Sequence, residues 1–354
     1  MIRMFHTSAT PSEVGVVADV LFSGELVGGQ HVIKLEGALG SWLKGQGVVT
    51  CASGTDALVA ALEGLGVGRG DEVIVPAITF SATAEAVLRV DARPIVADVS
   101  AFGVTPCVDQ IARKITANTK AVILVHLWGW PALNVLEIYQ YLKTRNILLI
   151  EDCAQAFGAA VNDTTVGTIG DAAAFSFYPT KPLGGIGDGG AVTFKDRKLV
   201  EWTRTRLNHG RNASRTQVRA GYNSRLDAVN AAVLYRRLIT YKHRLLHLAK
   251  LYDRYSTNLN DFCPWEDSYA TPAIYLRPYF YEGERTEIRT KLQCRGIETG
   301  VHYYPHLGEL NYLIESCPNA DKLVTKQVSL PCHAGMTLED VDKVCEEVSI
   351  LASP

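Results

Sequence analysis

The sequence predicts an α/β fold in which helices cover both faces of a mostly parallel sheet. From Gly47 onward, short β-rich runs alternate with helix-like segments, which is the pattern of βαβ units. The runs AVILVHL and ILLI are apolar at successive positions, as expected of central strands that are buried on both faces. The first predicted strands are Val48–Cys51, Glu72–Val75, Pro94–Ala97, Ala121–Leu127 and Ile147–Ile150.

The pattern changes in the second half of the chain. From Asp227 to about Asn258, apolar residues recur at spacings of three and four, which predicts one long helix. The 354 residues suffice for about two domains, and we expect a large domain over residues 1–240 and a small α+β domain over residues 241–354. The later predicted elements are strands at Ala172–Tyr178, Ala191–Phe194 and Ala273–Tyr281, a helix at Arg285–Arg295, and a helix at Leu338–Leu351 capped by Thr337.

Composition and charge exclude several classes of protein. The chain is 47% hydrophobic and 20% charged, which disfavours intrinsic disorder. Its formal net charge of -2 gives no general attraction to nucleic acid or to an acidic membrane, so we expect neither as a partner. No run approaches the roughly 18 apolar residues of a membrane span, and the first residues lack a secretory signal. We therefore expect a cytoplasmic enzyme.

Cysteine and histidine spacings indicate neither a metal site nor a disulfide framework. The cysteines are spread singly without a CxxC pair, so reduced and mostly buried thiols are expected, Cys263 among them. The nine histidines form no HExxH motif, and no GxSxG motif marks a serine nucleophile. We therefore expect no metal.

In open α/β sheets, ligands bind beyond the carboxyl ends of the strands, so residues that follow each apolar run are candidates. The first candidate is the turn CASGTDAL, where the predicted strand leads into a helix. Gly54 and Thr55 lie at this helix start, whose free N–H groups suit a phosphate. The alternative is that Ser53 or Thr55 is a plain N-cap.

Three further candidates follow other predicted strands. Glu151 and Asp152 end a buried strand, and such a carboxylate either meets a cation or donor or caps the next turn. Lys181 lies in apolar and glycine-rich surroundings that would lower its pKa and favour Schiff-base chemistry, although most lysines are solvated surface charges. Phe80 either stacks on a planar ligand or belongs to the core.

The motif GIGDGG, residues 185–190, satisfies the GxGxxG pattern of dinucleotide sites. That fingerprint must open a helix, whereas the residues AVTF that follow here indicate a strand. The sequence therefore predicts no NAD site of the Rossmann type.

Taken together, these segments resemble the DegT/DnrJ/EryC1/StrS family of pyridoxal 5'-phosphate (PLP) aminotransferases, from about Ser23 to Leu351. The pieces that carry the resemblance are SGTDAL, GVGRGDEVIVPAITFSATAEAV, IEDCAQAFGA, VGTIGDAAAFSFYPTKPLGGIGDGGAV, NHGR with GYNSRLDAVNAAVL, and RGIETGVHYYPHL followed by SLPCH. The resemblance implies the fold type I architecture, which is aspartate aminotransferase-like.

The resemblance also implies roles for individual residues. The family lysine that forms a Schiff base with PLP falls on Lys181, and the aspartate that pairs with the pyridine nitrogen falls on Asp152. Gln155 matches the glutamine beside the 3-hydroxyl of the ring, and Phe80 matches the aromatic residue that stacks on it. The implied phosphate-binding residues are Gly54, Thr55 and Ser176.

In the family, a second subunit completes the active site, and its asparagine corresponds to Asn223. A homodimer with shared active sites is thus implied. The resemblance places the substrate pocket near the segment HYYPHL, with His302, Tyr303 and His306 as candidate contacts. The chain departs from the family where it has WGWPALN, at residues 128–134, in place of YGQPADMD.

The implied activity is a ping-pong transamination. An amino acid, which we expect to be L-glutamate, would convert PLP to pyridoxamine 5'-phosphate, and a keto sugar, expected to be nucleotide-linked, would then receive the amine in amino-sugar biosynthesis. One alternative acceptor is a cyclitol or another carbocyclic ketone. A second alternative is a non-catalytic regulatory protein on the same fold.

Overall fold

A seven-stranded sheet forms the centre of the molecule in the computed structural model, which describes residues 1–101, 103–259 and 269–352. Its strands are β1 (Gly47–Cys51), β2 (Glu72–Pro76), β3 (Arg93–Ala97), β4 (Thr119–Val125), β5 (Leu148–Asp152), β8 (Ala172–Ser176) and β9 (Gly190–Phe194). Their order across the sheet is β1-β9-β8-β5-β4-β2-β3. β9 is antiparallel to β1 and β8, whereas the pairs from β8 to β3 are parallel. The predicted mostly parallel sheet is confirmed.

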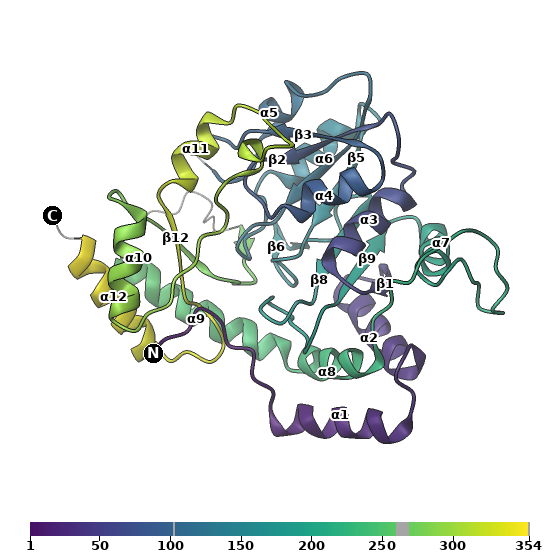
Figure 1. Ribbon diagram of the computed structural model, residues 1–354, viewed down its shortest axis with the longest axis horizontal. Helices are drawn as coiled ribbons and strands as arrows, with labels where there is room; N and C mark the ends of the chain where they lie inside the picture. Colours follow the sequence, from purple (N-terminus) through teal and green to yellow (C-terminus); the bar gives the residue numbers. More distant parts are fainter. Residues whose placement is uncertain (102, 260–268, 353–354) are drawn as a thin grey trace.

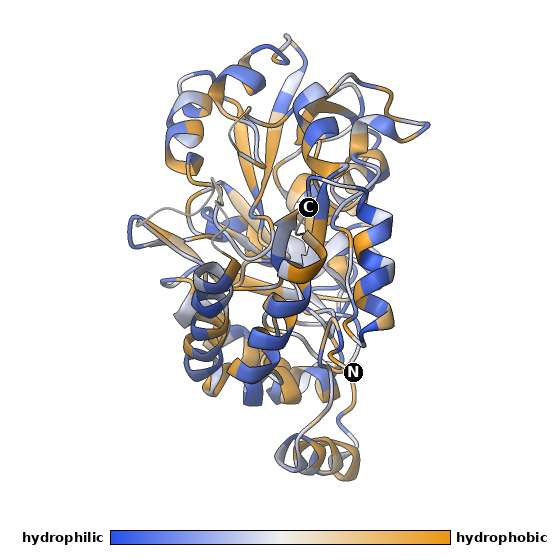
Figure 2. Cartoon of the chain, turned by 90° about the vertical axis from the view of Figure 1, so that its left-hand side faces the viewer, coloured by the Kyte–Doolittle hydropathy of each residue, from blue (hydrophilic) through white to orange (hydrophobic). Residues whose placement is uncertain are grey.

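Both faces of this sheet are buried, which explains the uninterrupted apolar runs. On β2, Val73 and Val75 belong to a core that includes α3 (Gly54–Gly64) and α4 (Ala82–Arg89), whereas Ile74 between them packs in a second core with α6 (Val135–Lys143). Successive side chains of a strand point to opposite faces, so apolar residues are needed at every position. Figure 2 shows the same distribution, with the central strands mainly orange and the surrounding helices blue on their outer sides.

The predicted long helix is wrong: the segment forms two helices, α8 (Ala228–Ile239) and α9 (Tyr241–Leu259). Thr240 separates them. Its hydroxyl donates a hydrogen bond to the carbonyl of Arg237, and its own carbonyl accepts the first N–H bonds of α9. A threonine hydroxyl that competes for a backbone carbonyl in this way favours a helix end. The apolar spacing continues across the break, so periodicity alone did not reveal it.

The C-terminal elements gather on one side of the sheet, on the left in Figure 1. They are β11 (Arg277–Phe280), α10 (Arg285–Cys294), η1 (Leu307–Glu309), α11 (Pro318–Val324), β12 (Gln327–Leu330) and α12 (Leu338–Ala352). The predicted strand at 273–281 is too long, because Ala273 and Tyr275 instead donate to the carbonyls of Gly129 and Trp128. The predicted cap of α12 is confirmed, since the Asp340 N–H donates to the Thr337 hydroxyl.

The remaining elements surround this framework. In Figure 1, α1 lies along the lower side of α8, and α7 lies at the edge of the sheet next to β1. None of the described helices is both long and apolar enough to cross a membrane. Cys263 lies outside the described residues. These elements are α1 (Pro11–Ser23), α2 (Gly29–Trp42), α5 (Val108–Ala112), β6 (Ala160–Val161), β7 (Thr164–Thr165), α7 (Arg197–Leu207) and β10 (Ala270–Thr271).

Candidate active site

A cavity of about 620 Å³ opens at the carboxyl ends of the parallel strands. Residues that follow β1, β2, β5 and β8 line one part of it, and Phe5 and the C-terminal residues Tyr275, His302 and Tyr303 line another. This is the edge at which open α/β sheets bind ligands. Its lining includes nine of the predicted residues, namely Gly54, Thr55, Phe80, Asp152, Gln155, Ser176, Lys181, His302 and Tyr303.

The start of α3 faces the cavity as a cradle of backbone donors. Ser53 is the N-cap, and its hydroxyl accepts the N–H of Asp56. The N–H groups at the first helical positions, Gly54 and Thr55, have no intrahelical acceptor and line the cavity. A Cβ at residue 54 would lie 2.7 Å from the Cβ of Ser176, so glycine is required for this close approach. The alternative that Ser53 is an N-cap is therefore confirmed, together with an anion-accepting helix start beside it.

Lys181 lies in the loop between β8 and β9, and its Nζ lies 4.8 Å from the centre of the Tyr275 ring. Burial lowers the pKa of the Lys181 amine to about 8, while the carboxylate of Asp152 opposes this shift. A lysine with this pKa has a far larger neutral fraction near physiological pH than an ordinary lysine, and a nucleophilic amine must be neutral.

The two adjacent carboxylates at the end of β5 have different environments. Asp152 is buried at the cavity, where its two oxygens accept hydrogen bonds from the Thr83 hydroxyl, at 3.0 Å, and the Ala154 N–H, at 3.1 Å. Burial raises the pKa of Asp152 even though these bonds and Lys181 act against the shift. This carboxylate would therefore stabilise a cation, or another N–H donor, that binds in the cavity.

Glu151 points to the opposite face of the sheet. One of its oxygens lies 3.0 Å from Nε2 of His126, and its carboxylate accepts the N–H groups of Gly167, Ile169 and Gly170. These bonds hold the pKa of Glu151 below its usual range despite burial. The alternation of side chains along β5 thus separates a structural glutamate from an aspartate at the cavity.

Gln155 is held by bonds from two other segments. Its Oε1 accepts the backbone N–H of Trp128, and its Nε2 donates to the hydroxyl of Tyr303, each at 2.8 Å. Phe80 is half exposed, and its ring lies 5.6 Å from that of Tyr303. Gln155, Tyr303 and Phe80 therefore form a connected wall of the cavity.

His302 is fixed by a hydrogen-bond network in the C-terminal segment. Its backbone N–H donates to Oε1 of Gln327, so Nε2 of that amide donates to the Ser329 hydroxyl. The hydroxyl proton of Ser329 then satisfies Nδ1 of His302, 2.8 Å away. Burial and the charge of Lys181 lower the pKa of His302 to about 4. The ring is therefore neutral, with its proton on Nε2, which bonds to no described residue.

Comparison with known proteins identifies the family. The family model for the DegT/DnrJ/EryC1/StrS aminotransferase family matches residues 8–349. The chain belongs to this family. A relative from Acidithiobacillus ferrooxidans, UDP-N-acetyl-3-dehydro-alpha-D-glucosamine 3-aminotransferase, is 38% identical and is aligned over 84% of this chain and 82% of its own.

Solved structures agree with this assignment. DesV from S. venezuelae is 32% identical with a TM-score of 0.92, over 97% of this chain and 95% of its own. The PLP form of the putative sugar aminotransferase Spr1654 from Streptococcus pneumoniae is 26% identical with a TM-score of 0.92, over 99% of this chain and 98% of its own. This chain is a PLP-dependent aminotransferase with the fold type I architecture.

Two predicted residues of this aminotransferase lie outside the cavity lining. His306 is buried beneath the C-terminal segment, where Nε2 bonds to Asp321 and Nδ1 accepts the N–H of Gly308. Both ring nitrogens are thereby used by groups of the chain itself. Asn223 is exposed, and its side chain accepts a bond from Arg225. A role for Asn223 in the cavity of its own chain is not supported.

Sequence analysis missed several residues of the site. Thr83 bonds to Asp152, Tyr275 lies under Lys181, and Trp128 orients Gln155. Thr83 is four residues after Thr79, and their hydroxyls lie 2.8 Å apart, so a pair of threonines following a strand was an available signal. No signal in the sequence pointed to Tyr275, because this residue reaches the cavity from the distant C-terminal segment.

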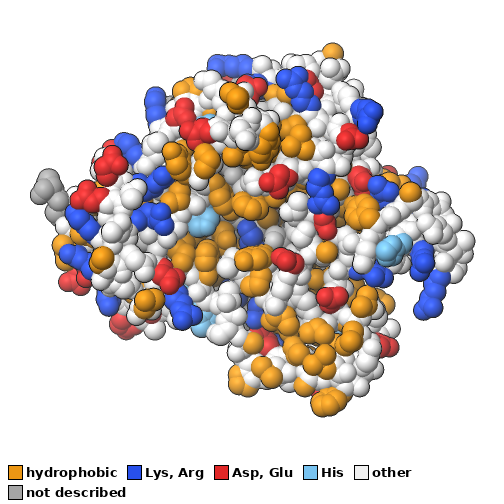
Figure 3. Space-filling model, in the orientation of Figure 1, with side chains coloured by type: hydrophobic (Ala, Val, Ile, Leu, Met, Phe, Trp, Pro, Cys, Tyr) orange, Lys and Arg blue, Asp and Glu red, His pale blue; other side chains and the backbone are white. Residues whose placement is uncertain are grey.

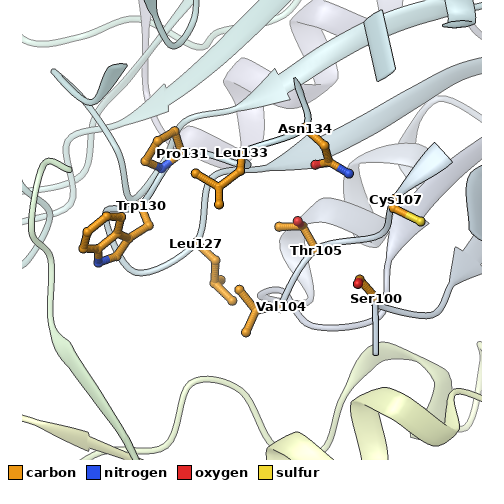
Figure 4. Close-up of a pocket in the computed structure, with 9 residues that line it drawn as sticks. All are labelled: Ser100, Val104, Thr105, Cys107, Leu127, Trp130, Pro131, Leu133 and Asn134. Atoms are coloured by element: carbon orange, nitrogen blue, oxygen red, sulfur yellow. The ribbon is translucent and has the colours of Figure 1, made fainter. Parts of the chain in front are cut away.

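A smaller cavity of about 130 Å³ lies beside the loop that departs from the family motif. Figure 4 shows Trp130, Pro131, Leu133 and Asn134 of that loop on one side and Ser100, Val104, Thr105 and Cys107 on the other. Its lining and that of the large cavity have no residue in common. The loop residues that line the smaller cavity therefore do not line the cavity around Lys181, whereas Trp128 at the start of the same loop bonds to Gln155.

Proposed function

We propose that this aminotransferase moves an amino group from an amino acid, L-glutamate, to a nucleotide-linked keto sugar in amino-sugar biosynthesis. The observation that carries the proposal is the cavity in which the amine of Lys181, the carboxylate of Asp152 and the start of α3 meet. The names of relatives support the acceptor class, since they include a 3-dehydro-glucosamine aminotransferase and dTDP-amino-sugar transaminases.

The residues of the cavity fit PLP. The N–H groups of Gly54 and Thr55 and the hydroxyl of Ser176 would hold its phosphate, and Asp152 would face its pyridine nitrogen. The raised pKa of Asp152 indicates a carboxylate that still lacks a strong donor, which a protonated pyridine nitrogen supplies. Bound PLP acts as an electron sink that stabilises negative charge on the substrate carbon.

Lys181 would serve as general base and acid after it has served as the anchoring amine. Its pKa of about 8 lies close to the operating pH, which is the condition for efficient proton transfer in both directions. The neighbouring Tyr275 ring excludes water from one side of Nζ. The same amine can thus take a proton from the substrate carbon, hold it at Nζ and return it in the second half of a 1,3 proton shift.

The C-terminal wall would recognise the acceptor. His302 offers a neutral N–H donor at Nε2, and the Tyr303 hydroxyl, which accepts from Gln155, retains its own proton for donation. Neutral donors of this kind suit the hydroxyl and carbonyl oxygens of a sugar. Phe80 provides an exposed ring for the planar cofactor.

A homodimer in which the partner's Asn223 completes the site is part of the proposal. Figure 3 shows hydrophobic side chains gathered over α1, at the bottom of the view. Exposed apolar residues there and in the following segment include Val14, Leu21, Phe22, Leu26, Val27 and Ile33, with Phe22 90% exposed. Contiguous apolar surface of this kind is typical of an interface. We also propose a cytoplasmic location and a domain division near Thr240.

The primary test replaces the anchoring amine. Lys181→Ala should lose the absorbance of covalently bound cofactor and reduce transamination by about 10⁴-fold or more, because both nucleophile and base are removed. Lys198→Ala, at an exposed lysine, is the control. Persistent turnover in Lys181→Ala would refute the assignment, and a wild-type protein that cannot take up added PLP would favour a non-catalytic role.

A second experiment identifies the acceptor. The pyridoxamine 5'-phosphate form of the enzyme is incubated with a panel of nucleotide-linked keto sugars and keto cyclitols. Recovery of the PLP spectrum with a keto sugar supports the proposal. Recovery with cyclitols alone would replace it by the carbocyclic alternative.

A further inference from the structure

Arg244 is a half-buried cation without a protein partner. It lies in the first turn of α9, and its guanidinium makes no hydrogen bond or ion pair with any described residue. The Nε atom is fully buried. Burial lowers the pKa of Arg244, although arginine keeps its charge at neutral pH. A partly buried charge without a hydrogen-bonded counterion is costly, so this position calls for an anionic partner.

The guanidinium lines a cavity of about 240 Å³ between the N-terminal segment, α8, α9 and the segment before α12. The other polar groups around it are already engaged. The Thr10 hydroxyl accepts the N–H of Glu13, the Ser8 hydroxyl bonds to His6, and the Thr240 hydroxyl donates to the carbonyl of Arg237. Arg244 is therefore the group with donors left to offer.

The charge of the cavity favours an anion. Its ionised side chains are Glu13, Arg237 and Arg244, and Glu13 is paired with Arg237 at 2.7 Å. That pair neutralises itself, which leaves the charge of Arg244 in excess. The first turn of α9 adds the positive end of its helix dipole. A carboxylate or phosphate would accept two parallel N–H bonds from the planar guanidinium.

We propose that this cavity is a second binding site, in which Arg244 holds a small oxyanion of the carboxylate or phosphate class. The site is separate from the PLP cavity, as the two linings have no residue in common. It borders the catalytic loop, because Pro179 lines it two residues before Lys181, and Arg237 donates to the carbonyls of Gly184 and Gly185. An oxyanion bound in this cavity would therefore affect the position of the loop that carries Lys181.

The test is a calorimetric titration of the PLP-saturated enzyme at constant ionic strength, with inorganic phosphate in one arm and succinate in the other. Saturation with PLP keeps phosphate out of the cradle at α3, and constant cofactor absorbance verifies this. The variants are Arg244→Gln, which removes the charge, and Arg244→Lys, which keeps it without the planar fork. Arg236→Gln is the matched control, since Arg236 is exposed on α8 and lies outside the cavity.

We expect one saturable site per chain for at least one anion, about ten-fold or more weaker in Arg244→Gln, intermediate in Arg244→Lys and unchanged in Arg236→Gln. Binding of phosphate alone or succinate alone identifies the source of the oxyanion. Absence of saturable binding to the wild type, or equal affinity in wild type and Arg244→Gln, overturns the proposal. If Arg244→Gln does not fold, the wild-type and Arg244→Lys titrations decide, and equal affinity in those two likewise overturns it.

Discussion

At Lys181, burial and a nearby carboxylate act on one amine in opposite directions. Burial favours the neutral form and Asp152 favours the charged form, with a resulting pKa of about 8. Because the neutral amine captures the cofactor, PLP uptake by the apoenzyme should accelerate as the pH rises and level off above about pH 9. Stopped-flow absorbance measures this profile, with a midpoint near pH 8.

The variant Asp152→Asn provides the matching control for that profile. Removal of the carboxylate takes away the charge that raises the pKa of Lys181, so the midpoint should move to lower pH. A midpoint that stays in place or moves upward would show that the two groups do not interact as described.

Ser329 controls His302 without entering the cavity lining. Its hydroxyl satisfies Nδ1, which keeps the proton on Nε2. Ser329→Ala should raise the KM for the acceptor about five- to ten-fold with little change in kcat, because roughly one hydrogen bond to substrate loses its orientation. Steady-state kinetics measures both constants. A fall in kcat alone would contradict this positioning role.

The protonation of His302 should leave no mark on the pH profile of the enzyme near neutrality. With its pKa at about 4, His302 should add no step to that profile between pH 6 and 8.

Sequence analysis brought together candidate residues that lie at or just after the ends of neighbouring strands. Asp152 ends β5, Ser176 ends β8 and Lys181 follows β8, so the parallel topology places all three at one cavity. His306 lies outside the cavity lining, because its ring bonds to Asp321, a tertiary partner that the local sequence does not reveal. Tyr275 could not be predicted for a similar reason, since only the folded C-terminal segment brings it to Lys181.

At the scale of elements, one ion pair joins α1 to α8. Glu13 and Arg237 are both largely buried, and Glu13 also belongs to the capping box of Thr10. Glu13→Ala should lower the free energy of unfolding by about 2–3 kcal/mol at pH 7, because Arg237 loses its charged partner. Urea denaturation measures the loss, and Glu201→Ala, at an exposed position on α7, should have a small effect.

The pH dependence of this pair has a definite sign. Burial alone would raise the pKa of Glu13, but the bonds and charge of Arg237 and Thr10 prevail and hold it below the usual 4.5. The stabilisation is therefore complete above pH 4.5 and is lost as the pH falls through the lowered value. The difference between wild type and Glu13→Ala should shrink in acid. A difference that grows there would disprove the arrangement.

Elements were predicted most reliably where composition and spacing agreed. The central strands and α12 lie close to their predicted bounds, because apolar runs and the Thr337 cap are local signals. The break at Thr240 was missed, since the apolar face continues on both sides of it. The predicted strand at 273–281 was too long, because Ala273 and Tyr275 bond to the loop after β4, a contact that the local sequence does not reveal.

For the whole molecule, the shared active site makes a quantitative prediction. Lys181→Ala and Asn223→Ala should each be inactive as homodimers. When the two chains are mixed, unfolded together and refolded, hybrids carry one intact site, so about a quarter of wild-type activity should return in an equimolar mixture. Transaminase assays measure the recovery. No recovery, despite hybrids demonstrated by differently tagged chains, would mean that Asn223 acts within its own chain, and an active Asn223→Ala homodimer would mean that Asn223 has no role in catalysis.

The order of the strands across the sheet lay beyond sequence analysis. Alternating elements predict parallel neighbours, but the insertion of β9 between β1 and β8 depends on the path of the glycine-rich loop that carries Lys181. The motif GIGDGG in this loop leads into the strand β9 and not into a helix, as the sequence predicted.

Trp128 connects the two halves of the molecule. Its backbone N–H bonds to Gln155, its indole N–H bonds to the carbonyl of His302, and its own carbonyl accepts the N–H of Tyr275. An incoming sugar that shifts the C-terminal wall must therefore move the amide beside the cofactor as well. Recognition of the acceptor and alignment of the ring are in this way mechanically coupled through a single residue.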